Sequence, residues 1–209
     1  MLSKRRDAGN IKLVAGHLSL DFINTLSSRL EPYQREYLSG YNELVEWSCH
    51  AGILPAEEAQ RLKRLGKRRP AEAVTVLNRA LEVREGLFRI FSALAQGKVP
   101  RDGDIDGLNE TLQDTMGRLQ VRRVKDQFHW EWTRDPSALD AMLWPIVRAA
   151  AELLVQRERS KVRQCSNMPV CQWLFLDKSK NRSRRWCSMD VCGSRDKVQR
   201  YYHRKKQAG

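Results

Sequence analysis

The sequence lacks a hydrophobic run long enough to cross a membrane, because no window approaches the roughly 20 apolar residues that a spanning helix needs. The N-terminus is basic, but Asp7, Asn10, Lys12 and His17 interrupt it before any apolar stretch that could form the core of a signal peptide. We therefore expect a cytoplasmic protein without a membrane partner. In that reducing compartment the five cysteines of the chain would remain thiols.

The sequence also lacks the common catalytic motifs. It has no Gly-rich loop that could cradle a phosphate and no nucleophile elbow. It has no cluster of histidine and carboxylate residues with the spacing of a catalytic metal site either. We therefore predict that the protein is not an enzyme.

Four of the five cysteines lie close to the C-terminus, with the spacing Cys165-x5-Cys171-x15-Cys187-x4-Cys192. Two pairs of thiolates separated by a longer spacer are typical of structural zinc sites, in which four ligands close a tetrahedron. The alternatives are disulfide bonds or unrelated free thiols. The reducing compartment favours one structural Zn²⁺ as the cofactor. Cys49 stands alone upstream, and we interpret it as a small buried apolar residue.

Acidic residues are scarce in the region that holds these cysteines. Residues 157–209 contain 15 Lys and Arg against 4 Asp and Glu, a net charge of +11, whereas residues 1–156 contain 23 against 21, a net charge of +2. A segment of about 155 residues can bury its own core, but one of about 50 residues needs help such as a metal. We therefore predict two domains, 1–156 and 157–209.

Hydrophobic periodicity predicts a mainly α-helical fold with small β-hairpins. We expect an extended segment and then a helix within 11–28, and further helices at 40–51, from Pro55, at 70–97, at 104–116, and from Asp135-Pro136 to 154 with a kink at Pro145. The basic run 67–69 is predicted to be a solvated connection. Alternation over 119–132 predicts a hairpin with Asp126-Gln127 near its middle.

In the C-terminal region, the apolar run 171–177 predicts a strand, followed by a polar loop at 178–183 and a second short run that ends at Cys187. We expect these two runs to form a hairpin that carries metal ligands near its open end. Residues 187–193 resemble a zinc knuckle, in which Gly193 would allow a tight turn. Ser194 would then cap a basic helix over 195–206.

The C-terminal residues follow the pattern RxCxxxxxCxWLFLDxSxxxxRRWCSMxxCGxRxKxxxYxxR, which resembles the CGNR zinc finger. The upstream segment LVAGHLSLDFINTL resembles the start of the ABATE domain that accompanies this finger. Together the resemblances span nearly the whole chain. They imply a bacterial, stress-related transcription regulator whose finger binds DNA and whose N-terminal domain senses a ligand or signal. The Cys-Gly-Asn-Arg sequence that gives the finger its name corresponds to residues 192–195, where Ser194 replaces the family's Asn.

The resemblance places the metal ligands on Cys165, Cys171, Cys187 and Cys192. The positive charge also favours a polyanion, because each phosphate that is neutralised releases condensed counterions. We expect double-stranded DNA as the partner, while RNA or an acidic protein would satisfy the same charge argument; a homodimer is expected by analogy alone. The candidate nucleic-acid contacts are Lys178, Lys180, Arg182, Arg184, Arg185, Arg195, Lys197, Arg200 and Arg204.

A second set of polar residues lies near the N-terminus, interspersed with apolar residues. Helical spacing would place His17, Asp21 and Asn24 on one face. One interpretation is a pocket for a small-molecule effector; the other is a set of internal hydrogen bonds that fasten this segment to the long helix. The residues concerned are His17, Asp21, Asn24, Thr25, Trp47 and Arg84.

Overall fold

The computed structural model describes residues 7–207, and within 199–207 it describes the side chains of Tyr201 and Lys205 alone. The fold is mainly α-helical with two small antiparallel hairpins, as predicted. In the described residues, no helix is sufficiently long and apolar to cross a membrane. The α-helices are α1 (Leu18–Ile23), α2 (Tyr41–His50), α3 (Ala56–Arg68), α4 (Pro70–Ala95), α5 (Asp102–Met116), α6 (Leu143–Val155) and α7 (Ser194–Gln207).

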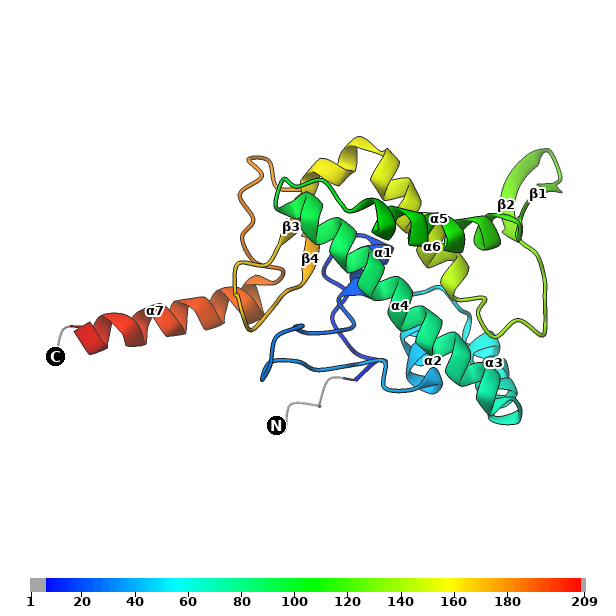
Figure 1. Cartoon of the computed structure of the whole chain (residues 1–209), viewed down its shortest axis with the longest axis horizontal. Helices are drawn as coiled ribbons and strands as arrows, with labels where there is room; N and C mark the ends of the chain where they lie inside the picture. The colour runs from blue at the N-terminus through cyan, green and yellow to red at the C-terminus, as the bar shows by residue number, and fades with distance from the viewer. Residues whose placement is uncertain (1–6, 208–209) are drawn as a thin grey trace.

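Helix α4 is the long central helix against which the other helices of the body pack (Figure 1). It begins at Pro70, where the missing N–H of proline costs nothing because the first turn of a helix leaves its N–H groups unpaired. Its buried residues recur with helical spacing and include Val76, Leu87 and Phe91. Through this stripe α4 contacts α1, α2, α3, α5 and α6, which confirms the prediction of a long central helix.

The predicted break between α3 and α4 is shorter than expected. Lys67 and Arg68 still belong to α3, and Arg69 alone separates the two helices. Lysine and arginine are good helix formers and interact favourably with the carbonyl end of a helix, so a basic run need not be a loop.

The hairpin of β1 (Leu119–Val124) and β2 (Gln127–Trp132) confirms the period-two prediction. Its turn lies at residues 125 and 126, one position earlier than expected, and Lys125 adopts a positive φ of 56° there. Figure 1 shows the hairpin projecting from the helical body at the end opposite α7. Trp132 near its base packs against Trp144 of α6, with ring centroids 6.0 Å apart.

The predicted helix start at Asp135-Pro136 is wrong. Asp135 does accept hydrogen bonds, from the Ser137 N–H at 2.8 Å and the Ser137 hydroxyl at 2.6 Å, but they cap a turn. Helix α6 begins only at Leu143. Pro145 therefore lies in the first turn, where it removes no helical hydrogen bond, so the predicted kink in a longer helix does not arise.

The second hairpin pairs β3 (Val162–Gln164) with β4 (Leu174–Leu176). The sequence correctly predicts β4, but its partner strand precedes it instead of following it, which corrects the expected pairing with the run ending at Cys187. A short 3-10 helix, η1 (Arg157–Lys161), leads from α6 into β3. Val162 and all three residues of β4 are buried, because the hairpin packs into the helical body beside α1 and α4.

A seam of hydrogen bonds joins residues 14–29 to the C-terminal region. Asn24 donates through Nδ2 to the Leu174 carbonyl and accepts through Oδ1 from the Leu174 N–H, both at 2.9 Å. The Leu176 N–H donates to the Ala15 carbonyl at 2.8 Å, and Trp173 Nε1 donates to the Leu26 carbonyl at 3.2 Å. The cysteines and the helical body consequently share one hydrophobic core.

Candidate metal centre and nucleic-acid interface

The four C-terminal cysteines converge on one point. Their Sγ atoms all lie within 4.8 Å of one another, and all four residues are buried, with at most 6% of their surface exposed. The sulfurs of Cys171 and Cys187 are 3.6 Å apart, as are those of Cys187 and Cys192. None of the four forms a disulfide bond. The cluster is therefore a candidate metal centre built entirely from thiols.

The spacing of the sulfurs fits a tetrahedrally coordinated ion. With a Zn–S distance of about 2.3 Å, the edge of a regular tetrahedron is about 3.8 Å, close to the 3.6 Å that separates Cys187 Sγ from the sulfurs of Cys171 and Cys192. Soft thiolates select Zn²⁺ or iron over hard cations such as Mg²⁺ and Ca²⁺. Four protein ligands also fill the coordination shell, which is typical of a structural site.

The thiols also influence one another's protonation. Hydrogen bonding with Cys165 is the main cause that raises the pKa of Cys171 and of Cys187 above the ordinary range, and burial raises both further. Removing all the protons without a cation would place several negative charges within 4.8 Å of one another. A bound divalent ion supplies the positive charge that such an arrangement needs.

Local backbone structure brings each cysteine to the cluster. Cys165 follows β3, and the Cys171 N–H donates to the Asn167 carbonyl at 2.9 Å across a tight turn. The Cys187 N–H points at the Cys165 sulfur at 3.5 Å. Cys192 lies in a short π-helical turn, η2 (Met189–Gly193), whose Cys192 N–H donates to the Ser188 carbonyl at 2.9 Å.

Gly193 ends the tight turn of η2, as predicted, and an added Cβ there would lie only 3.2 Å from the Met189 sulfur. One expectation about the knuckle needs correction. Ser194 is not an N-cap, since its backbone is already helical and its hydroxyl donates to the Met189 carbonyl at 3.4 Å. Helix α7 therefore continues directly from η2, and the cluster fixes its start.

The basic loop that follows β4 is ordered by a buried carboxylate. Asp177 Oδ1 accepts from the Ser179 N–H at 2.9 Å and from the Ser179 hydroxyl at 2.6 Å, and Oδ2 accepts from the Arg184 N–H at 3.1 Å. Burial disfavours the charged form of Asp177, but these hydrogen bonds hold its pKa below the ordinary value. Asp177 is not among the predicted site residues, although Asp followed two residues later by Ser is a common turn signal.

Arg184 differs from the other predicted nucleic-acid contacts because its side chain is used inside the fold. Its guanidinium donates to the carbonyls of Trp186, Val14 and Cys187 and lies over the Phe175 ring. The other predicted cations with described side chains are exposed: Lys178, Lys180, Arg182, Arg185, Arg195 and Lys197. The predicted contacts Arg200 and Arg204 belong to α7, but their side chains lie outside the described residues.

Helix α7 carries three exposed cations, Arg195, Lys197 and Lys205, away from the body of the molecule. Figure 1 shows α7 projecting from the rest of the fold as an extended arm. Arg195 and Lys197 lie in its first turns, and Lys205 lies near its C-terminal end. Val198 and Tyr201 are also exposed on this helix.

The polar residues predicted to form an N-terminal pocket have internal partners instead. Asn24 pairs with β4, and the Thr25 hydroxyl donates to the Phe22 carbonyl at 2.7 Å. Asp21 accepts from the Ala15 N–H at 3.0 Å, and His17 Nδ1 lies 2.9 Å from the Ser19 hydroxyl. Burial lowers the pKa of His17, and nearby Lys178 lowers it further.

The two remaining members of that set lie in the interior. Trp47 is fully buried and packs against Phe22, with ring centroids 5.3 Å apart. Arg84 forms a two-pronged ion pair with Glu36 at 2.6 and 2.7 Å and also donates to Glu85 at 2.9 Å. These contacts support the alternative interpretation, in which the set fastens the N-terminal segment to α4 and β4.

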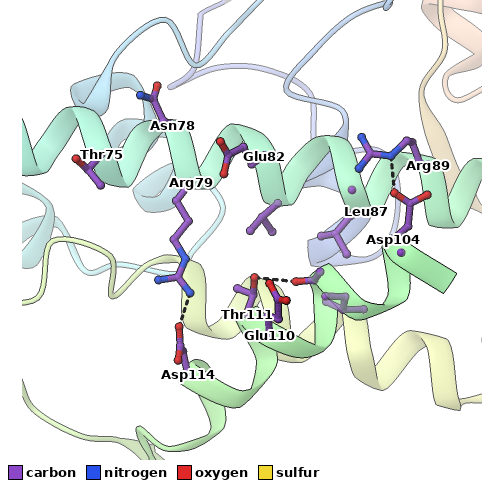
Figure 2. A pocket seen from close by; sticks show the side chains of 15 residues that line it. Thr75, Asn78, Arg79, Glu82, Leu87, Arg89, Asp104, Glu110, Thr111 and Asp114 are labelled. Atoms are coloured by element: carbon purple, nitrogen blue, oxygen red, sulfur yellow. Dashed lines mark hydrogen bonds and ion pairs between the residues drawn. The ribbon is translucent and has the colours of Figure 1, made fainter. Parts of the chain in front are cut away.

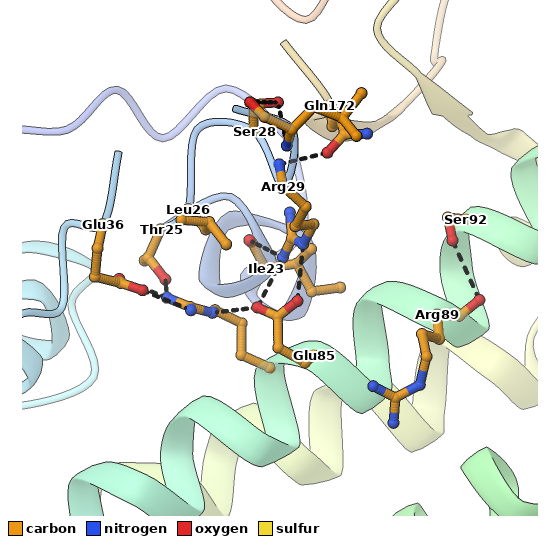
Figure 3. Close-up of polar contacts among 12 residues, drawn as sticks. Ile23, Thr25, Leu26, Ser28, Arg29, Glu36, Glu85, Arg89, Ser92 and Gln172 are labelled. Carbon is orange, nitrogen blue, oxygen red and sulfur yellow. Dashed lines mark hydrogen bonds and ion pairs between the residues drawn. The ribbon is translucent and has the colours of Figure 1, made fainter. Parts of the chain in front are cut away.

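Figure 3 shows how this network extends from Glu85 through Arg29 to Gln172. Glu85 of α4 accepts from Arg29 Nε at 2.9 Å, and the Arg29 N–H donates to Gln172 Oε1 at 2.5 Å. The Arg29 guanidinium lies 3.6 Å from the centre of the Phe88 ring. No sequence signal identified Arg29, Glu36 or Glu85, because these residues meet only after folding.

The cavities lie elsewhere. A groove of about 660 Å³ runs between α4 and α5 and is crossed by the ion pairs Arg79–Asp114 and Arg89–Asp104 (Figure 2). A cleft of about 490 Å³ lies beside the cysteine cluster. Neither of these two cavities is lined by any of the six residues predicted to form the pocket.

Comparison with protein families agrees with both halves of this structure. The model of the ABATE family, described as "Putative stress-induced transcription regulator", matches residues 16–157, and the model of the CGNR zinc finger matches residues 161–205. No curated protein matches the chain. The first match covers most of the helical body, and the second contains all four clustered cysteines. The chain therefore belongs to the ABATE family and carries a CGNR zinc finger at its C-terminal end.

Proposed function

We propose that this protein is a DNA-binding transcription regulator whose four clustered cysteines hold one structural Zn²⁺. The observation that supports this proposal most directly is the convergence of four buried sulfurs at the start of a projecting basic helix. In this proposal Cys165, Cys171, Cys187 and Cys192 hold the ion. When bound, the ion supplies structural cross-links and no catalytic chemistry, because four protein ligands leave no open position.

The charge distribution supports nucleic acid as the partner. The net charge of +11 over residues 157–209 contrasts with +2 over the preceding part of the chain. A basic surface gains free energy on a duplex because each neutralised phosphate releases condensed counterions. The exposed cations of α7 and of the loop after β4 are the proposed phosphate contacts, and Arg184 is left out because its guanidinium is used internally.

The shape of α7 supports double-stranded DNA in particular. The major groove of B-DNA admits a single α-helix, and side chains on such a helix can reach base edges. Figure 1 shows α7 standing clear of the body, as insertion into a groove requires. Double-stranded RNA has a major groove too narrow and deep for side chains to read, which makes it a poorer fit.

The experiment is a titration of purified protein with duplex DNA over a range of salt concentrations, using fragments first selected from genomic DNA by the protein itself. We expect affinity to fall steeply with salt while one sequence remains preferred. Replacing Arg195 and Lys197 by Ala should lower the slope of log K against log salt by about 0.9 for each phosphate that the variant no longer neutralises.

A matched variant is available at the far end of the molecule. Lys67 and Arg68 are exposed near the end of α3, so replacing both by Ala removes the same charge away from α7. This control should keep the slope of the unmodified protein. A preference for single-stranded or structured RNA, or no duplex binding at low salt, would refute the proposal.

A further inference from the structure

The cleft beside the cysteine cluster is built by both halves of the chain. Its walls come from the zinc finger, through Trp173, Ser188 and Arg195, and from the N-terminal segment, through Lys12, Ser27, Tyr33, Arg35 and Tyr37. Cys171, Cys187 and Cys192 form part of its floor. The cleft thus adjoins the first turn of α7, to which Arg195 belongs.

Three cations, Lys12, Arg35 and Arg195, line this cleft, and no carboxylate does. The groove between α4 and α5 has two arginines against four carboxylates, and the cavity between α3 and the base of the β1–β2 hairpin has three arginines against three carboxylates. The cavity lined by Leu94 and Arg159 also lacks a carboxylate, but it has a single cation. Lys12 also forms an ion pair with Asp190 at 4.0 Å, and Asp190 is largely exposed.

Hydroxyl groups complete a lining that suits an anion with several oxygens. Tyr33, Tyr37 and Ser188 line the cleft and carry hydroxyl groups, whereas the Ser27 hydroxyl already donates to the Tyr33 carbonyl at 2.9 Å. The Arg35 guanidinium lies 4.9 Å from the centre of the Tyr37 ring, which limits the directions in which the side chain can point. Arginine and lysine beside hydroxyl donors are the usual protein partners of phosphate oxygens.

We propose that this cleft holds a backbone phosphate of the same duplex that α7 contacts. The inference rests on the proposed function, and it adds a contact surface supplied by the N-terminal region through Lys12 and Arg35. Because Arg195 belongs to both surfaces, a strand that leaves α7 meets the cleft directly. Phosphate contacts typically fix the orientation of a protein on DNA. Contacts on two sides of α7 would fix the orientation of this helix in the same way.

The same three cations could instead neutralise the metal centre. One Zn²⁺ with four thiolates carries a net charge of −2, and three cysteines of the cluster line the cleft. The two roles are separable, because neutralisation of the centre would show in metal retention, whereas a phosphate contact would show in the salt dependence of DNA binding.

The test compares full-length proteins, each assayed for bound metal and for duplex binding over a range of salt concentrations. Replacing Lys12 and Arg35 together by Ala should lower the slope of log K against log salt by about 0.9, the value for one phosphate. Metal content should be unchanged. The exchange of Lys12→Arg with Arg35→Lys should keep the slope, and the Lys67→Ala, Arg68→Ala variant should keep it as well.

The outcomes distinguish the inference from the function on which it rests. If the unmodified protein binds duplex but the Lys12→Ala, Arg35→Ala variant keeps its slope, the cleft contact is refuted and the proposed function stands. If that variant loses metal while its metal-loaded fraction keeps the slope, the cations serve the metal centre. Saturable binding of inorganic phosphate without any change in the slope would show a free-anion site and refute the duplex contact.

Discussion

At the scale of single residues, the polar side chains near the N-terminus act as internal fasteners. Their residue types are visible in the sequence, but their partners are not, since Asn24 meets a backbone 150 positions away. The sequence therefore predicts a polar set without deciding between a pocket and a structural role. Only the contacts made on folding favour the second interpretation.

Asp21 gives a prediction about pH. Burial is the main cause that raises its pKa to about 6 in the folded protein, and hydrogen bonds from the Ala15 and Val14 N–H groups oppose the rise. A raised acid pKa means that the folded state binds the proton more tightly than the unfolded state. Stability should therefore fall as pH rises from about 4 through 6, by up to about 3 kcal/mol.

Asp21→Asn should remove this loss and raise the free energy of unfolding at pH 7, because the amide oxygen can still accept from the Ala15 N–H. Urea unfolding at pH 4 and pH 7 measures the effect. Asp106→Asn, at an exposed position on α5, is the control and should change stability by less than about 0.5 kcal/mol. Equal pH dependence in the unmodified protein and Asp21→Asn would contradict the assignment.

At the scale of helices and strands, the sequence predicts an element best where its hydrophobic pattern is strong and regular. The period of α4 and the alternation of β1 and β2 locate those elements within a few residues. The prediction of the start of α6 is wrong because Asp135-Pro136 can cap a turn as well as a helix. The prediction of the partner of β4 is wrong because β3 is only three residues long and shows no alternation of apolar and polar residues.

Asn24 is the residue that fixes β4 against α1. Asn24→Ala would leave the buried N–H and carbonyl of Leu174 without these partners, which should cost about 2 to 4 kcal/mol. The loss of stability is measured as a lower midpoint of urea unfolding, while the dependence of the unfolding free energy on urea concentration stays constant. Asn78→Ala, at an exposed position on α4, should be nearly neutral. A loss below about 1 kcal/mol for Asn24→Ala would show that other contacts hold the strand.

At the scale of the whole molecule, the zinc finger and the helical body share one core. The sequence predicts the four-cysteine set, because thiol spacing is a local signal. It does not show that Leu174 and Phe175 pack with residues of α1 and α4 in the same hydrophobic cluster. The division at residue 156 therefore stays a prediction, made from the charge distribution, and the two parts share one core.

The shared core predicts that the C-terminal fragment depends on the rest of the chain. Residues 157–209 alone would expose β4 and leave its hydrogen bonds to Asn24 and Ala15 unmade. We expect this fragment to bind Zn²⁺ more weakly than the full chain, because metal affinity and folding are coupled. Competition with a chelator measures both affinities. Equal affinity in fragment and full chain would show an independent domain.

The most direct test of the central claim is native mass spectrometry of gently purified full-length protein. We predict one Zn²⁺ per chain in the unmodified protein and in Cys49→Ser, since Cys49 lies outside the cluster. Cys192→Ser should lose the ion, because it removes one of four converging sulfurs. A metal-free mass for the unmodified protein, or full retention of zinc by Cys192→Ser, would contradict the account.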